Sequence, residues 1–184
     1  GDTILMVPDL YTAWHAGISS WQNFKFLNKN SIGIEISNPG HENFYKKFSK
    51  KQINSTSNLI LFLIKKYKIK KQFILGHSDV APDRKKDPGE KFPWKYLFKK
   101  KIGILHNLDE RKLIKNRNKK INNLQKNIFI QNLHKIGYPR ALKIKKYKYS
   151  KLLTKAFQRR FRQDLINGVI DQECLIISKK LINI

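Results

Sequence analysis

The sequence predicts an α/β fold in which a central mixed sheet is flanked by helices, followed by a small three-helix domain. The first observation is the alternation of Ile32, Ile34 and Ile36, which is the period of a strand with one buried face. The second is the helical spacing of apolar residues over 49–67. The third is the return of helical spacing beyond residue 124, after a polar stretch. Strand and helix in alternation indicate helices packed against a sheet.

Local signals support the N-terminal elements in turn. Residues 3–7 form an apolar run and are predicted to be a short strand. In the alternating run 31–37, Gly33 and Glu35 share the face opposite the isoleucines. Ser49 precedes the apolar spacing of the first helix, so it is the expected N-cap.

The change in composition after residue 100 divides the chain. We predict a catalytic domain over 1–104, a linker or solvated helix over 105–123, and a helical domain over 124–184. About sixty residues suffice for a small independent domain. Its expected helices are 124–136, 150–161 and 171–183.

Charge and cysteine content limit the classes of function. The net charge is +26, from 39 basic and 13 acidic residues, which predicts salt-sensitive attraction to polyanions. The alternative is that many lysines only solvate the surface. Cys174 is the sole cysteine, which excludes an intrachain disulfide, and it is expected to be a small buried hydrophobe. No apolar run reaches the ~18 residues of a membrane-spanning helix.

The residues that carry chemistry follow a short predicted strand, 73–75. His77 stands at the end of this strand, where a rigid element meets an open loop, and the loop can fold Asp87 back towards it. Imidazole and carboxylate are both good zinc ligands. Lys85 and Glu35 would add a cation and a base, and this set suits hydrolysis of an amide. The alternative is that His77 is a hydrogen-bonded structural residue.

Several motifs occur in a characteristic order, at residues 13–17, 31–35, 76–79, 87–89 and 92–94. In this order they resemble the zinc-dependent N-acetylmuramoyl-L-alanine amidases of the AmiD and AmpD type, whose fold is shared with phage lysozyme-type amidases and peptidoglycan recognition proteins. The resemblance covers about residues 1–100. It implies hydrolysis of the bond between N-acetylmuramic acid and L-alanine, in cell-wall degradation or recycling.

The resemblance also assigns roles to residues. His77 and Asp87 match zinc ligands, Glu35 matches the catalytic glutamate, and Lys85 matches the lysine that assists the tetrahedral intermediate. The family's first zinc histidine has no match here. Because the chain begins at Gly1 rather than Met and reads straight into the apolar run 3–7, we expect that ligand on a preceding segment.

Four further residues are predicted to contact substrate. His15 matches a histidine beside the family's cleft and is the nearest substitute for the unmatched ligand. Asn28 matches a position near the cleft, or is a turn residue. Trp14 could stack on a sugar or pack in the core. Arg84 could meet stem-peptide carboxylates or only solvate its loop.

The C-terminal motifs at 133–138, 156–162 and 166–171 are similar to the three-helix peptidoglycan-binding domain often appended to such amidases. The alternative is a generic helical bundle. Together these resemblances imply a monomer that binds peptidoglycan or muropeptides and no specific nucleic acid, without a transmembrane segment. They favour the bacterial cell envelope, periplasmic or anchored to the outer membrane, over the cytoplasm. Two other functions stay open, a non-catalytic peptidoglycan recognition protein and a basic nucleic-acid binder.

Overall fold

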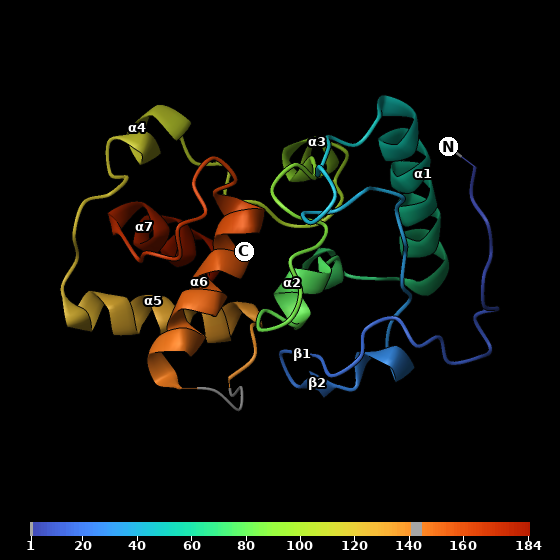
Figure 1. Cartoon of the computed structure of the whole chain (residues 1–184), viewed down its shortest axis with the longest axis horizontal. Coiled ribbons are helices and arrows are strands. Elements are labelled where there is room, and N and C mark those ends of the chain that lie inside the picture. Colours follow the sequence, from blue (N-terminus) through green and yellow to red (C-terminus); the bar gives the residue numbers. More distant parts are fainter. Residues whose placement is uncertain (1, 141–144) are drawn as a thin grey trace.

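A computed structural model describes residues 2–140 and 145–184, and helices dominate it (Figure 1). We call the described residues up to 104 the N-terminal lobe and those from 105 onwards the C-terminal lobe. In Figure 1, α1 lies on the side of the molecule away from α4, α5 and α7. The helices and strands are β1 Ser20–Trp21, β2 Phe24–Lys25, α1 Lys50–Tyr67, α2 His77–Val80, α3 Trp94–Lys99, α4 Glu110–Ile114, α5 Asn123–Ile136, α6 Lys146–Phe161 and α7 Gln172–Leu181, with 3-10 turns at Leu27–Lys29 and Lys71–Phe73.

The predicted central sheet is not formed by the described residues. Their only strands are β1 and β2, an antiparallel pair with Trp21 opposite Phe24. Residues 3–7 and 31–37 have no regular secondary structure, and 73–75 lie in and after a 3-10 turn. A strand is stabilised when a neighbour pairs its backbone N–H and C=O groups, and no described segment does so here. The prediction of these three strands was therefore wrong.

The predicted sidedness of the isoleucine run is confirmed in part. Ile34 and Ile36 pack, half-buried, against a core cluster that contains Ile53 and Trp94. Ile32 is 44% exposed and does not follow the pattern. The hydrophobic alternation thus directs two of its three side chains inwards even without a paired sheet.

The first predicted helix is confirmed with its cap. The Ser49 hydroxyl accepts a hydrogen bond from the Gln52 backbone at 3.2 Å, and the Gln52 side chain accepts one from the Ser49 N–H at 3.0 Å. This reciprocal pair satisfies two N–H groups that the first turn leaves free. The helix buries Ile53 and Ile60, which belong to the apolar face that the sequence predicts.

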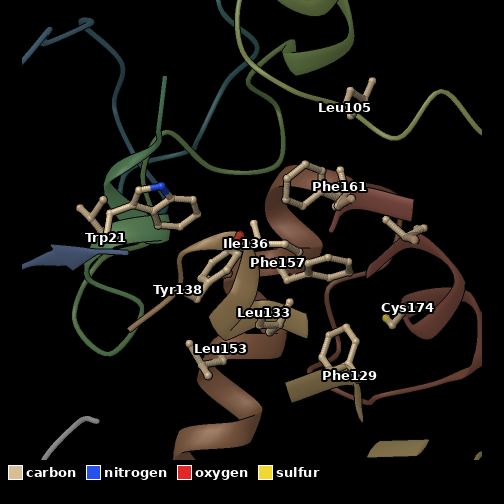
Figure 2. Packing of buried hydrophobic residues seen from close by; sticks show 14 of the residues in the cluster. Trp21, Leu105, Phe129, Leu133, Ile136, Tyr138, Leu153, Phe157, Phe161 and Cys174 are labelled. Atoms are coloured by element: carbon tan, nitrogen blue, oxygen red, sulfur yellow. The ribbon is translucent and has the colours of Figure 1, made fainter. Parts of the chain in front are cut away.

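The three C-terminal helices are also confirmed, α6 beginning four residues before its predicted start. Figure 2 shows their shared core, where the rings of Phe129 and Phe157 meet edge to face with a centroid distance of 5.1 Å. Leu133 and Leu153 are fully buried beside them. Cys174 is buried as expected, and burial raises the pKa of its thiol to about 12.

One hydrophobic cluster runs through both lobes. Trp21 of β1 packs against Tyr138 just after α5, with ring centroids 5.0 Å apart (Figure 2). Gly137 makes this contact possible, because a Cβ there would lie 2.4 Å from the Trp21 ring. The Gln22 N–H also donates to the Gly137 carbonyl at 2.7 Å. The antiparallel pair of β1 and β2 is therefore packed against the C-terminal end of α5.

A buried polar network ties α2 to the C-terminal lobe. The Asp79 carboxylate accepts from the Tyr138 hydroxyl at 2.8 Å and pairs with Arg160 at 2.6 Å. Arg160 also donates to the Ile74 carbonyl at 2.7 Å. Because His77 begins the same helix as Asp79, this network determines where His77 lies.

Residues 105–123 pack onto the C-terminal helices. Part of this segment is α4, and Leu113 and Ile121 are buried. Arg117 donates to both carboxylate oxygens of Glu173, at 2.7 and 2.9 Å. The division into independently folding domains stays a prediction. Among the helices of the described residues, none is long and apolar enough to cross a bilayer.

Candidate active site

His77 and Asp87 lie side by side, as the sequence predicts. The His77 Nδ1 atom is 3.0 Å from an Asp87 carboxylate oxygen, and its Nε2 atom is 3.3 Å from the Ala16 carbonyl oxygen. The loop returns because the Ser78 N–H donates to the Asp87 carbonyl at 2.9 Å. His77 is the first residue of α2 rather than the end of a strand.

The two ring nitrogens of His77 face different groups. A carbonyl oxygen only accepts, so Nε2 carries the proton that faces Ala16. Nδ1 can donate a proton to the Asp87 carboxylate at this distance, and when it carries no proton it offers a lone pair to a metal ion. Imidazole and carboxylate are both zinc ligands, and a zinc ion bonded to both atoms at ~2.0–2.2 Å would hold them roughly 3.3–3.6 Å apart, slightly further than the 3.0 Å of this hydrogen-bonded pair.

Asp87 is held in the form that binds a metal. Burial alone would raise the pKa of its carboxyl group. The hydrogen bond and charge of His77, together with the charge of Lys85, outweigh burial and lower that pKa below its usual value. Among the described residues, no group of three His, Cys, Asp or Glu side chains converges on one metal position. The described residues thus bring together two side chains of the kinds that bind zinc, whereas a catalytic zinc site has three protein ligands.

A loop over residues 16–18 forms the wall next to His77. The Asn28 side-chain oxygen accepts from the N–H groups of Ala16 and Gly17, at 2.7 and 3.3 Å. The Arg84 guanidinium donates to the Ala16 carbonyl and to the Ile18 carbonyl, the latter at 2.7 Å. Asn28 and Arg84, which the sequence suggested as substrate contacts, are here engaged in holding this loop.

His15 is anchored on the same wall. Its ring nitrogens lie 3.0 Å from the Ala13 carbonyl oxygen and 3.0 Å from the Ser31 hydroxyl. Gly33 allows the following segment to approach, because a Cβ there would lie 2.6 Å from the His15 ring. Both nitrogens of His15 therefore face protein groups, an arrangement that does not direct it to a metal with His77.

The remaining predicted residues are accessible. Glu35 follows Gly33 by two residues and is exposed, and within the described part of the chain its carboxylate has no hydrogen bond or ion pair. Lys85 is half-buried, and its charge acts on Asp87. Trp14 is 87% exposed, which contradicts the alternative that it packs in the core.

Two structural contacts of the site had no signal in the sequence. The contacts of Arg84 span 66 and 68 residues, and those of Asn28 span 11 and 12. Nothing local marks these side chains as partners of a backbone loop. The turn at Gly17, where φ is +58° and a Cβ would lie 2.9 Å from Arg84, was the nearest available clue.

The sequence of the chain is similar to those of known N-acetylmuramoyl-L-alanine amidases. Residues 1–90 match the family model Amidase_2, described as N-acetylmuramoyl-L-alanine amidase. Over 182 residues the chain is 31% identical to N-acetylmuramoyl-L-alanine amidase AmiD of Escherichia coli, covering 96% of this chain and 66% of that protein. Over 87 residues it is 40% identical to 1,6-anhydro-N-acetylmuramyl-L-alanine amidase AmpD of Haemophilus influenzae, covering 46% of this chain and 45% of that protein.

Solved structures are similar across both lobes. The complex of Escherichia coli AmiD with the substrate anhydro-N-acetylmuramic acid-L-Ala-D-gamma-Glu-L-Lys superposes with a TM-score of 0.84 at 31% identity, covering 97% of this chain and 71% of that one. AMPDH3 from Pseudomonas aeruginosa gives 0.82 at 29% identity, with the same coverage. The chain spans just under two thirds of the curated AmiD sequence and about half of AmpD.

Proposed function

The chain belongs to the family of N-acetylmuramoyl-L-alanine amidases that includes AmiD and AmpD, and on that premise we propose that it hydrolyses the amide between N-acetylmuramic acid and L-alanine in peptidoglycan or its fragments. The observation that carries the proposal is the convergence of His77 Nδ1 and the Asp87 carboxylate at 3.0 Å. The substrate in the AmiD complex is a muropeptide with the stem L-Ala-D-gamma-Glu-L-Lys. We propose substrates of this class for the present chain.

His77 and Asp87 would hold a zinc ion, through Nδ1 and a carboxylate oxygen. Such an ion lowers the pKa of a bound water to about 7 and polarises the scissile carbonyl. The Ala16 carbonyl orients the His77 ring by accepting its Nε2 proton. Because a catalytic zinc takes three protein ligands, we propose that a histidine outside this pair supplies the third.

Two other side chains would perform the proton and charge chemistry. Glu35 would accept the proton of the attacking water and return it to the leaving amine. Its exposed, unpaired carboxylate is free to exchange that proton. Lys85 would stabilise the negative charge that develops on the substrate oxygen. The loop at Ala16, held by Asn28, would keep the cleft wall in place.

Substitution of Glu35 tests the catalytic assignment. Glu35→Gln is expected to reduce release of stem peptide from purified muropeptide by about 10²–10⁴-fold, because the general base is lost. Peptide release is measured by liquid chromatography. Glu42→Gln removes the same charge from an exposed turn and is expected to match the parent. Turnover by Glu35→Gln at the parental rate would remove Glu35 from the mechanism.

Zinc content tests the metal site independently of turnover. The parent protein, dialysed with zinc and then freed of excess metal, is expected to retain zinc by atomic absorption. His77→Ala and Asp87→Ala are each expected to lower the zinc affinity roughly 10–100-fold or more. His41→Ala, which removes a histidine paired with Glu90 instead, serves as the control. Equal zinc retention in all four proteins contradicts the assigned ligands.

A second function is favoured by one observation, the presence of two rather than three converging ligands among the described residues. A protein with such a site would act as a peptidoglycan recognition protein that binds without cleaving. Muropeptide binding by the zinc-treated protein, without any peptide release, would support this alternative. Location in the cell envelope stays a prediction.

A further inference from the structure

An open pocket of about 430 Å³ lies where the two lobes meet. His41, Lys86 and Glu90 line it from the N-terminal lobe, and Lys155, Arg159 and Gln163 line it from the C-terminal lobe. Its volume falls within the roughly 300–1,000 Å³ of small-molecule sites. It is distinct from the pair of His77 and Asp87, neither of which lines it.

The walls of this pocket are held by polar contacts between the lobes. The Gln163 amide donates to the Glu90 carbonyl at 2.7 Å and to the Phe92 carbonyl at 2.8 Å. His41 pairs with the Glu90 carboxylate at 3.0 Å and stacks on Tyr45 with ring centroids 4.3 Å apart. The pocket is thus part of the folded interface.

Three cations face the pocket without a protein partner. Lys155 and Arg159 are four residues apart on α6, so they share one helix face, although like charges at that spacing disfavour the helix. Lys86 faces them from the other lobe. Within residues 2–140 and 145–184, none of the three makes a hydrogen bond or ion pair. Burial lowers the pKa of Arg159 despite the attraction of Glu90, as expected for a cation that lacks a close counter-charge.

The pocket begins at the loop that carries Asp87. Lys86 is the residue before Asp87, and consecutive Cα atoms lie about 3.8 Å apart. Gly89 lies against His41 of the pocket wall, where a Cβ would be 2.8 Å from the imidazole. A three-residue peptide extends roughly 10 Å, so a stem attached at the scissile amide would run several residue lengths beyond the loop that carries Asp87.

We propose that the interlobe pocket binds carboxylate groups of the peptidoglycan stem peptide, with Lys155 and Arg159 as binding residues supplied by the C-terminal lobe. The identity of the peptide rests on the proposed function. A gamma-linked glutamate leaves its α-carboxylate free, and the last residue supplies a second carboxylate. These groups would offset the unpaired charges of Lys155 and Arg159.

The acidic residues of the pocket select against a polyphosphate ligand. Glu90 and Asp164 both line it, and the Asp164 side chain is 68% exposed. Their carboxylates would repel a continuous chain of phosphates and attract the ammonium group of a diamino acid. The mixture of charges therefore matches the end of a stem peptide better than nucleic acid.

Calorimetric titration of the full 184-residue chain with the free peptide L-Ala-D-gamma-Glu-L-Lys tests the proposal without requiring turnover. The double variant Lys155→Ala/Arg159→Ala is expected to bind at least about tenfold more weakly, because two charge-assisted contacts are lost. The matched control Lys148→Ala/Lys151→Ala removes the same charge from exposed positions of α6 outside the pocket. It is expected to bind within roughly twofold of the parent, since distant exposed charges are screened.

Peptide with both carboxylates amidated is expected not to bind. The proposal is overturned if the parent does not bind the free peptide, if both double variants bind it equally weakly, or if inorganic phosphate competes as well as the peptide.

Cleavage assays distinguish a failure of the pocket proposal from a failure of the proposed amidase function. Unchanged peptide affinity in Lys155→Ala/Arg159→Ala, with muropeptide still cleaved by the parent, refutes the pocket and leaves the amidase function. If peptide binding depends on Lys155 and Arg159 but the parent does not cleave muropeptide, the amidase function is refuted and the pocket remains.

Discussion

Asp79 is a residue whose role depends on partners far along the chain. It lies two positions after His77, and its side chain is 1% exposed. One carboxylate oxygen accepts from the Tyr138 hydroxyl, and the other accepts from Arg160 and the Gly76 N–H. A buried charge of this kind is tolerated because both of its oxygens have donors. Asp79 therefore helps to fix the position of α2, the helix that begins at His77.

Removing the charge of Asp79 should destabilise the fold strongly. Asp79→Asn leaves Arg160 buried without its counter-ion, and breaking a buried pair in this way costs about 3–5 kcal/mol. Urea unfolding followed by circular dichroism measures the change. The control is Glu110→Gln, which removes an exposed partner of Lys95 and should cost about 0–1 kcal/mol. Equal effects of the two substitutions would show that the buried network contributes no special stability.

Among the elements, α1 is specified most completely by its own residues. Its apolar face, its capping pair of Ser49 and Gln52, and its end at Lys68 with φ of +55° all lie within one segment. Local agreement of this kind makes a helix predictable. The helix also forms the platform on which the half-buried Ile34 and Ile36 rest.

The cap of α1 can be tested separately from its packing. Ser49→Ala removes the acceptor for the Gln52 N–H and should lower the free energy of unfolding by about 1 kcal/mol. Ser49→Asn retains a capping oxygen and should remain near the parent. Thermal unfolding of the three proteins makes the comparison. A loss for Ser49→Asn as large as that for Ser49→Ala would mean that the hydrogen bond is not responsible.

The packing of α6 in the core depends on Phe157. Phe157 is fully buried between α5 and α7, and its truncation to Ala should cost about 3–5 kcal/mol by leaving a cavity. Phe62 on α1 is 59% exposed, so Phe62→Ala is the matched control, expected within about 0.5 kcal/mol of the parent. Denaturant midpoints measure both. Similar losses would contradict the placement of Phe157 in the core.

Across the whole molecule, a buried histidine, His106, and a half-buried one, His134, make stability depend on pH. Burial lowers the pKa of His106 and of His134, although hydrogen bonds to the Phe161 and Tyr138 carbonyls oppose the shift. The unfolded chain therefore binds protons more readily, with a pKa of about 6.5. The stability that results is complete above that pH and is lost as pH falls from about 6.5 through the folded pKa values.

The melting temperature should therefore fall between pH 7.5 and pH 5. Carboxylates with lowered pKa, such as Glu90 and Asp171, contribute stability that is lost as pH falls below about 4.5, so their main effect lies below this window. His106→Gln with His134→Gln should flatten the dependence relative to the parent. If the melting temperature of the double variant changes with pH as steeply as that of the parent, groups other than these two histidines cause the pH dependence.

The sequence by itself determined the features whose causes lie close together in the chain. Apolar spacing specified α1, α5, α6 and α7, Ser49 marked the start of α1, and the short loop after His77 was enough to bring Asp87 to it. Hydrophobic periodicity and a loop of ten residues are local properties, so no distant partner is needed to predict them.

The tertiary structure alone decided the features that need a distant partner. Residues 31–37 have the pattern of a strand, but a pattern cannot supply the neighbour whose backbone completes a sheet. The hold of Arg84 on the loop at Ala16 and the pairing of Asp79 with Arg160 join residues 68 and 81 positions apart. The interlobe pocket likewise exists only because two segments fold against each other. Contacts over such separations follow from the arrangement of all elements at once, which no short window of sequence contains.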